Sequence, residues 1–384
     1  MLRVERLADP DAFKPLVPQW EAIEKTLSPR VPFTMPLWNF LWWQHLSEHR
    51  RPLSDEFHSF AVYSAQGALV AIAPMMLTHR PASGPLRVRK LQFLGADPFI
   101  TEVRGLICAP ANQFEATVAI IEHLYAHRQD WDWVEWFGAL GPAVPDDYTA
   151  HGFAFERVYQ VPDHYLPLPD SWEALRSRFP PNTKEALRKC YRSLSRDGHA
   201  FTLRTTDRPA DVPAAMATFF RLHTARAASP AGARHPDLFQ RRKPRAFLND
   251  LIEQAALRRR LRIYELLVDG DVVATRIAFE FEREIYLYYS GFDPAWSNHN
   301  VMTTLMAEIM KWAIERGFAI LNLSTGTDRS KTRWRPDAAV SWVGTLVSPT
   351  WRGRTAHFAY EDILARNLAP SLPTIAALAR RWKA

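Results

Sequence analysis

The sequence predicts an α/β protein with mixed sheets and flanking helices, arranged as two domains of similar design. Residues 285–334 read as strand, polar loop, helix, strand and polar loop, an order that forms a crossover unit with parallel strands. The order hairpin, strand, helix, strand occurs in residues 58–138 and again in residues 261–326, with little residue identity between them. The chain also has 384 residues, which exceeds the usual span of one hydrophobic core.

The first half begins with a strand and two predicted helices. Aromatic and aliphatic residues recur near helical spacing in residues 32–46, which predicts a core helix, with an aromatic wall of a ligand site as the alternative. A hairpin then turns at Gln66-Gly67. The predicted elements are a strand over 3–7, a helix over 10–26, hairpin strands over 58–64 and 69–77, a strand over 91–95, a helix over 112–127 and a strand over 131–137.

Between the halves, residues 182–197 form a basic amphipathic helix. Leu187, Tyr191 and Leu194 give it a narrow apolar stripe, and Lys and Arg residues occupy much of the remaining surface. The basic face is either a solvated surface or an acceptor-side patch for an anionic sugar, a lipid phosphate or RNA. Further helices are predicted over 211–225 and 243–258, separated by an Ala-, Pro- and Gly-rich stretch that we expect to be a mobile loop.

The second half repeats the hairpin and contains the crossover unit. Its hairpin strands cover 261–268 and 272–281, and residues 285–289 are aromatic and β-branched, as in a half-buried strand. A helix is predicted from Asn300, whose side chain can cap the first free amides, to Gly317. The remaining predictions are an apolar helix face of Met302, Leu305, Met306, Ile309, Ala313 and Ile314, a strand over 318–323, a polar loop over 324–331, a strand near 343–347 and two C-terminal helices.

These elements predict one ligand site. The two parallel strands end on the same side of the sheet, where open α/β folds bind ligands. The N-terminus of the connecting helix lies near the same edge, and its free amides favour an anion such as phosphate. The site is therefore bounded by residues 290–293, 298–303 and 324–331.

The residues at this edge also form a recognisable pattern. The first strand ends in Ser290-Gly291-Phe292-Asp293, and the stretch after the second strand contains Gly326, Lys331, Arg333 and Trp334. This order resembles the GNAT acetyltransferase superfamily, and specifically its CelD-like branch, which is named after a cellulose-biosynthesis protein and is related to the FemABX aminoacyl transferases.

Three features depart from the pattern of that branch. Asp328 comes one place later than the usual acid, and Ser330 stands where a tyrosine is usual. Asn300-Val301-Met302 replaces the usual Ser-Pro-Gly that opens the helix. Glycine lets the backbone approach a phosphate closely, so the bulky Met302 implies either a shifted cofactor pose or a lost coenzyme A site.

The resemblance implies a tandem GNAT arrangement. We expect an N-terminal domain over 1–165, a catalytic domain over 166–348 that includes the basic helix, and a helical extension over 349–384. The first domain has Gly138-Ala139-Leu140-Gly141-Pro142 where the second has its polar loop, so we expect only the second domain to be catalytic.

The implied reaction is transfer of an acyl group from acetyl-CoA or another acyl-CoA to an amine. The pantetheine would pair with the free edges of the two parallel strands, and the pyrophosphate would bind the first amides of the helix. The residues that the resemblance assigns to the cofactor are Ser290, Gly291, Phe292, Asn300, Val301, Met302, Thr303, Gly326 and Lys331.

Catalysis also needs a proton acceptor for the incoming amine. Asp293 and Asp328 are the candidates, and each is equally consistent with a turn residue. Tyr288 and Tyr289 are expected on opposite faces of their strand, so that only one of them, taken as Tyr289, lines the site and returns a proton to the thiolate.

The acceptor is identified by class only. By analogy it is a small-molecule or glycan amine, such as a sugar nucleotide or an envelope or polysaccharide precursor, with Lys184, Arg188, Arg192 and Trp334 as substrate-binding residues. A first rival is a FemABX-like transferase that uses aminoacyl-tRNA, which the basic helix favours. A second is a non-catalytic relative with a degenerate coenzyme A site, which Asn300-Val301-Met302 favours.

Composition narrows the class of protein further. A net charge of +7 and a pI near 9.5 suit a phosphate-bearing ligand, a nucleic acid or an anionic membrane, and the basic C-terminus is a candidate membrane contact. Cys108 and Cys190 are expected to be buried free thiols in a reducing compartment, and without a signal peptide we expect a cytoplasmic protein. No nucleotide-binding or hydrolase motif is present, and we interpret the H-x-x-E-H match at residues 45–49 as chance rather than a metal site.

Overall fold

The computed structural model describes residues 2–50, 52–84, 87–97, 99–138, 144–229 and 236–360. The chain divides into two compact units, Met1–Val161 with Val340–Ala384, and Pro162–Ala339. The first border lies close to the predicted one at 165/166. The second differs from the predicted end at 348, because the strand that begins at Asp337 pairs with a strand of the first unit from Trp342 onward.

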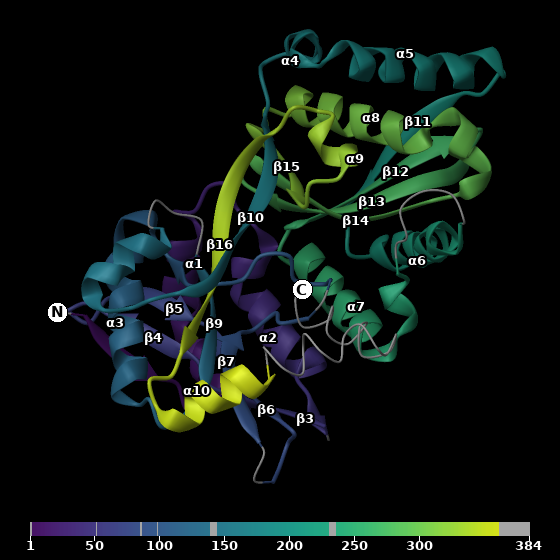
Figure 1. The fold of residues 1–384 in the computed structure, drawn as a ribbon. Helices are drawn as coiled ribbons and strands as arrows, with labels where there is room; N and C mark the ends of the chain where they lie inside the picture. Colours follow the sequence, from purple (N-terminus) through teal and green to yellow (C-terminus); the bar gives the residue numbers. More distant parts are fainter. Residues whose placement is uncertain are drawn as a thin grey trace. The chain divides into compact units, whose positions relative to one another are not determined.

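The second unit is a mixed sheet with helices on both faces (Figure 1). Neighbouring strands are antiparallel except β14 and β15, which are parallel. Helices α5 and α8 lie on one face of the sheet, and α6 and α7 lie on the other. In sheet order the strands are β11 (Phe201–Thr206), β12 (Leu261–Val268), β13 (Asp271–Phe281), β14 (Glu284–Phe292), β15 (Ile320–Thr325) and β10 (Glu156–Pro167), which begins in the first unit; the helices are α4 (Trp172–Arg178), α5 (Pro181–Arg196), α6 (Val212–Ala228), α7 (Arg242–Leu257), α8 (Val301–Glu315) and α9 (Arg329–Thr332).

The apolar residue pattern of α8 determines which face of the helix packs on the sheet of this unit. Its apolar residues recur at helical spacing, and Leu305, Ile309 and Ala313 are fully buried against the sheet. Met302 and Ile314, at the margins of the same face, are partly buried. The predicted crossover from β14 through α8 to a parallel β15 is therefore confirmed.

The first unit contains two sheets. Strands β7 and β9 pair in parallel at three positions, and α3 connects them, so β7–α3–β9 repeats the order of β14–α8–β15. The larger sheet contains β2 (His49–Arg50), β3 (Leu53–Phe57), β6 (Met75–Arg80), β7 (Val88–Phe93), β9 (Trp133–Gly138) and β16 (Asp337–Val347); the smaller contains β1 (Arg3–Arg6), β4 (Phe60–Tyr63), β5 (Leu69–Ala73) and β8 (Ile107–Cys108); the helices are α1 (Val17–Glu24), α2 (Pro36–Leu46), α3 (Gln113–Ala126) and α10 (Trp351–His357).

One local prediction for the first unit is wrong. The strand expected over 69–77 is two strands in different sheets, because Pro74, which lacks an amide proton, separates β5 from β6. The H-x-x-E-H match at residues 45–49 is not contained in one helix, because α2 ends at Leu46 and His49 lies in β2. Cys108 and Cys190 are buried free thiols, as predicted.

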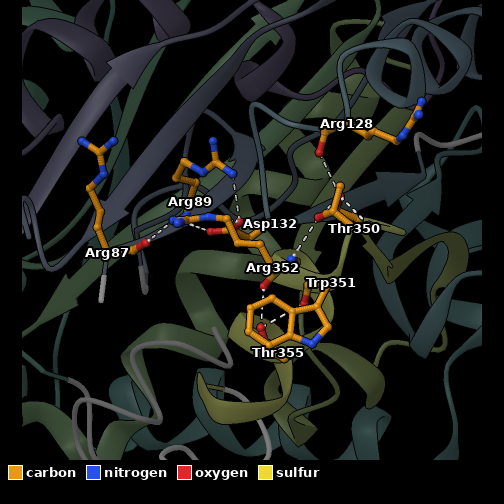
Figure 2. A network of polar contacts seen from close by, with 10 residues as sticks. Arg87, Arg89, Arg128, Asp132, Thr350, Trp351, Arg352 and Thr355 are labelled. Carbon is orange, nitrogen blue, oxygen red and sulfur yellow. Dashed lines mark hydrogen bonds and ion pairs between the residues drawn. The ribbon is translucent and has the colours of Figure 1, made fainter. Parts of the chain in front are cut away.

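A buried carboxylate fixes α10 to the first unit (Figure 2). Asp132 is fully buried and accepts hydrogen bonds from the Arg89 guanidinium and from Arg352 Nε, both at 3.0 Å. Arg352 also donates to the Arg87 carbonyl at 2.5 Å, and the Ser348 amide donates to the Asp132 carbonyl at 2.9 Å. These bonds explain why the described residues after 340 belong to the first unit. The rest of the predicted extension, residues 361–384, and part of the predicted mobile loop, residues 230–235, lie outside the described residues.

Within the described ranges, no helix is long and apolar enough to cross a lipid bilayer.

Candidate functional site

The parallel strands β14 and β15 separate before they end. They pair only at Glu284–Ile320, Ile285–Leu321 and Tyr286–Asn322, although both strands continue and residues 284–325 are all described. Beyond these positions β14 stays paired with β13, and β15 stays paired with β10. The carboxyl ends of the two strands therefore diverge, and no strand pair joins β14 to β15 across the gap beyond Tyr286–Asn322.

A β-bulge lies on the β14 side of this gap. The pairing with β13 shifts between Arg276 and Ala278, so that Tyr288 and Tyr289 together oppose Ile277. The two tyrosine rings contact each other, with centroids 4.6 Å apart and planes at 86°. The prediction that they point to opposite faces is wrong, because simple alternation does not hold across a bulge.

Helix α8 follows the end of β14 after a short 3-10 helix over Pro294–His299. Asn300 precedes it in the left-handed conformation (φ 53°), and its side chain makes no capping bond, so the predicted side-chain cap is wrong. The Asn300 carbonyl instead accepts hydrogen bonds from the amides of Thr303 at 2.7 Å and Thr304 at 3.3 Å. The amides of Val301 and Met302, the first two of the helix, do not bond to the Asn300 carbonyl. Amides at a helix N-terminus favour an anion.

A largely buried arginine lies at the same helix end. Arg333 Nη2 donates to Thr303 Oγ1 at 3.0 Å, while Arg333 Nε is buried with no hydrogen-bond partner among the described residues. Burial lowers the pKa of Arg333 below its ordinary value, and the nearby Arg329 lowers it further. A cation beside a helix N-terminus opposes the helix dipole, so an anion bound there would compensate both charges.

The two candidate bases both form caps. Asp293 accepts the Ala295 amide at 2.9 Å and begins a short 3-10 helix. Asp328 accepts the Ser330 amide at 3.0 Å and begins α9, a single helical turn within the stretch predicted as a polar loop. Burial opposes ionisation of Asp328, but hydrogen bonds from Ser330 and the charge of Lys331 outweigh it and hold the pKa below its ordinary value. Asp328 is therefore a weak proton acceptor.

The remaining loop residues lie at the end of β15. Lys331 Nζ donates to the Thr325 carbonyl and lies 3.8 Å from Asp328 Oδ2. Gly326 adopts φ 104°, which favours glycine, and this turn brings α9 back towards the strand. Lys331 is therefore fixed to the edge of the gap by a backbone contact.

Helix α6 holds the end of β14 from the other face of the sheet. His223 Nδ1 lies 3.2 Å from the Ser290 carbonyl, and Arg226 Nη1 donates to Ser290 Oγ at 2.8 Å. A Cβ atom added to Gly291 would lie 2.5 Å from the His223 amide nitrogen, so only glycine permits this approach. Ser290 and Gly291 thus position the strand end against α6.

His223 and Arg226 were not predicted from the sequence. They lie one turn apart in α6, His223 inside the helix predicted over 211–225 and Arg226 one residue beyond it, and the fold alone brings them to β14. His223 packs between Phe219, Phe239 and Tyr289, and burial lowers its pKa. A neutral histidine can still donate from Nδ1 to the Ser290 carbonyl.

Three of the predicted substrate-binding residues share one face of α5, and the fourth, Trp334, lies in the hydrophobic core. Lys184 Nζ donates to the Ser177 carbonyl at 2.8 Å, Arg188 pairs with Glu185, and Arg192 is exposed, so this basic face of α5 is turned to solvent. Trp334 is only 1% exposed and packs against Phe179 in the core, which leaves its indole no surface for a substrate.

The chain is similar to known proteins in one domain of its sequence and in its fold. Residues 181–332 match the model of the acetyltransferase (GNAT) domain. The crystal structure of FemX is similar, with a TM-score of 0.56 and 9% identity over 88% of this chain and 96% of FemX. A tandem GNAT protein from the clavulanic acid biosynthesis pathway aligns with a TM-score of 0.47 and 13% identity over 91% and 99% of the two chains. L-PGS from Bacillus licheniformis aligns with a TM-score of 0.47 and 12% identity over 90% and 96%.

No curated protein matches the sequence. At 9% identity, the likeness to FemX concerns the fold. Together with the two strand–helix–strand units and the matched domain, it confirms the predicted fold class of two tandem GNAT-like α/β units. The CelD-like branch remains a prediction.

Proposed function

We propose that the second unit is an N-acyltransferase that moves an acyl group from acyl-CoA, with acetyl-CoA as the first candidate, to an amine. The observation that supports this most directly is the divergence of β14 and β15, the two strands that α8 connects, inside the residues that match the GNAT domain. The gap offers backbone donors and acceptors in extended geometry, which suits the amide groups of a pantetheine arm.

The residues at the helix end fit the anionic part of such a donor. The free amides of Val301 and Met302, with the partly unpaired guanidinium of Arg333, form a site for a pyrophosphate. The usual glycine of this position is replaced by Met302. Its side chain packs against the hydrophobic core, so it does not fully cover the free amides. Gly326 and Lys331 line the opposite edge of the gap in this proposal.

The chemistry requires little from the side chains. A thiol is a good leaving group, and a backbone amide beside the β14 bulge would polarise the thioester carbonyl. Asp293 and Asp328 already accept capping hydrogen bonds. We therefore propose that they stabilise their loops and do not act as the base. Tyr289 remains the proposed proton donor to the departing thiolate, since it lies at the bulge and its ring contacts that of His223.

The acceptor is proposed by charge. Lys184, Arg188 and Arg192 share a basic face of α5 on which Arg188 and Arg192 are exposed, and this face suits an anionic amine such as a sugar nucleotide or an envelope precursor. The same face favours the rival function, transfer from an aminoacyl-tRNA. The two functions differ in salt dependence, because contacts with many phosphates make RNA binding fall steeply with ionic strength.

Thiol release tests the proposal. The purified protein is mixed with acetyl-CoA or a long-chain acyl-CoA and a panel of amino sugars, amino-sugar nucleotides and peptides with free amines. We expect release that depends on both a donor and one class of amine. Release that never exceeds the rate without protein, combined with salt-sensitive binding of bulk tRNA, would favour the rival function instead.

A further inference from the structure

The first unit contains a cavity of about 50 Å³ that the proposed acyl transfer does not use. Most of its wall is apolar, with Val31, Phe33, Trp38, Leu94 and Leu106 among the side chains that line it. A water-sized group needs roughly 10–15 Å³ of such space, so about three to five chain atoms fit. Apolar cavities of this kind stay dry and accept apolar groups.

One charged side chain, that of Arg104, lines the cavity. Its guanidinium donates to the Gly95 carbonyl at 2.9 Å and to Glu135, and it lies over the Phe137 ring at 4.3 Å. Gly95 makes this possible, because it adopts φ 88° and a Cβ there would lie 2.5 Å from Thr101 Cγ2. The segment after β7 is thus folded so that Arg104 joins the cavity to the sheet.

Arg104 belongs to a buried cluster with one excess positive charge. Glu135 on β9 binds Arg104 through one oxygen and Lys90 Nζ on β7 through the other, the latter at 2.6 Å. The side chains of Lys90 and Arg104 are only 10% and 7% exposed. Burial alone would raise the pKa of Glu135, but the two cations hold it at about 2, so the carboxylate is ionised at neutral pH.

Neither cation has a second carboxylate among the described residues, so two buried cations share one anion. A buried uncompensated charge is costly in a folded protein and is normally neutralised by a partner. The excess charge indicates an anion, and the adjoining apolar cavity indicates an apolar tail. These two observations are independent, and they meet at Arg104.

We propose that this cavity binds a small monoanion with a short apolar chain, of which a medium-chain carboxylate is the simplest example. The chain occupies the space beside Trp38 and Leu106, and the carboxylate compensates the cluster of Lys90, Glu135 and Arg104. This site lies wholly within the first unit, for which the sequence predicted no catalytic role. The proposal for this site does not depend on acyl transfer in the second unit.

Calorimetric titration of the full chain with sodium hexanoate tests the proposal, with hexanol and hexylammonium as matched probes. We expect saturable binding of one hexanoate, weaker binding of hexanol and none of hexylammonium. Thermal unfolding should shift upward with hexanoate, because a ligand that binds only the folded state stabilises it.

Two variants locate the site. Lys90→Met leaves a neutral pair of Arg104 and Glu135, so hexanoate affinity should fall at least about tenfold while hexanol binding is retained. Val103→Phe fills the cavity and should abolish binding of both. Arg3→Gln, which removes the same charge from a side chain that is 63% exposed, is the control and should change neither affinity.

Three outcomes would overturn the proposal: no binding of hexanoate at millimolar concentration, equal binding of hexanoate and hexylammonium, or unchanged hexanoate affinity in Lys90→Met. If Val103→Phe does not fold, the Lys90→Met result still decides the role of the charge.

Discussion

Gly291 allows α6 to lie directly against the end of β14, and its replacement by alanine tests that contact. The new Cβ would lie 2.5 Å from the His223 amide nitrogen and 2.6 Å from the Leu222 carbonyl carbon. Ordinary contact begins near 3.4 Å, and both neighbours are backbone atoms, so α6 has to move by about 1 Å. That movement also strains the bond between His223 Nδ1 and the Ser290 carbonyl.

The expected cost follows from these two effects. Overpacking of a tight contact typically costs about 1–3 kcal/mol, and a weakened hydrogen bond adds about 1 kcal/mol, so Gly291→Ala should lower the free energy of unfolding by about 2–4 kcal/mol. Urea unfolding followed by tryptophan fluorescence and circular dichroism measures this change. Because the strand end is displaced, acyl-CoA affinity should fall as well in the molecules that remain folded.

Gly270→Ala provides the matched control. It lies in the β12–β13 hairpin with φ 96° and no atom within 4 Å, so it introduces backbone strain of about 1–2 kcal/mol without crowding α6. It should leave acyl-CoA binding unchanged. If Gly291→Ala stays within about 0.5 kcal/mol of the wild type, the argument that glycine is required for this contact is refuted.

Three further predictions concern charged groups. Asp328→Asn keeps an acceptor for the Ser330 amide and should preserve both stability and turnover. Asp328→Ala removes the acceptor and should lower the free energy of unfolding in urea by about 1 kcal/mol. A stable but inactive Asp328→Asn would show that Asp328 is the base. Arg333→Gln should weaken acyl-CoA binding by about tenfold in calorimetry, and Arg316→Gln, at the other end of α8, should not. Burial and the charge of Arg6 lower the pKa of His58 to about 4, so the folded state resists its protonation and stability falls as the pH drops from 6.5 to 4. The loss should approach about 3 kcal/mol, and His58→Asn should remove that part of the pH dependence in urea unfolding; an unchanged pH profile would exclude His58 as its source.

The crossover unit could be predicted from the sequence because its signals are local. The apolar residues of α8 recur every three or four positions, and the β-branched and aromatic residues of β14 are contiguous. Asn300 shows the limit of such signals. Its position before the helix was predicted, but its left-handed backbone, which moves the side chain away from the capping position, was not.

The contacts that shape the candidate site were not predictable in the same way. The bulge at Tyr288 and Tyr289 depends on the register with β13, and alternation along one strand carries no information about a neighbour. His223 and Arg226 lie more than sixty residues from Ser290, so only the packing of α6 on β14 brings them together. Trp334 fits the family pattern, but its burial depends on the position of Phe179.

Direct calorimetric titration of the purified protein with acetyl-CoA and with a long-chain acyl-CoA, at low and moderate salt, tests the central claim. We predict saturable binding of one molecule of at least one donor, retained at moderate salt and weakened in Arg333→Gln. No binding of either donor at millimolar concentration would contradict the claim. It would mean that the gap between β14 and β15 and the start of α8 at Val301 do not form an acyl-CoA site.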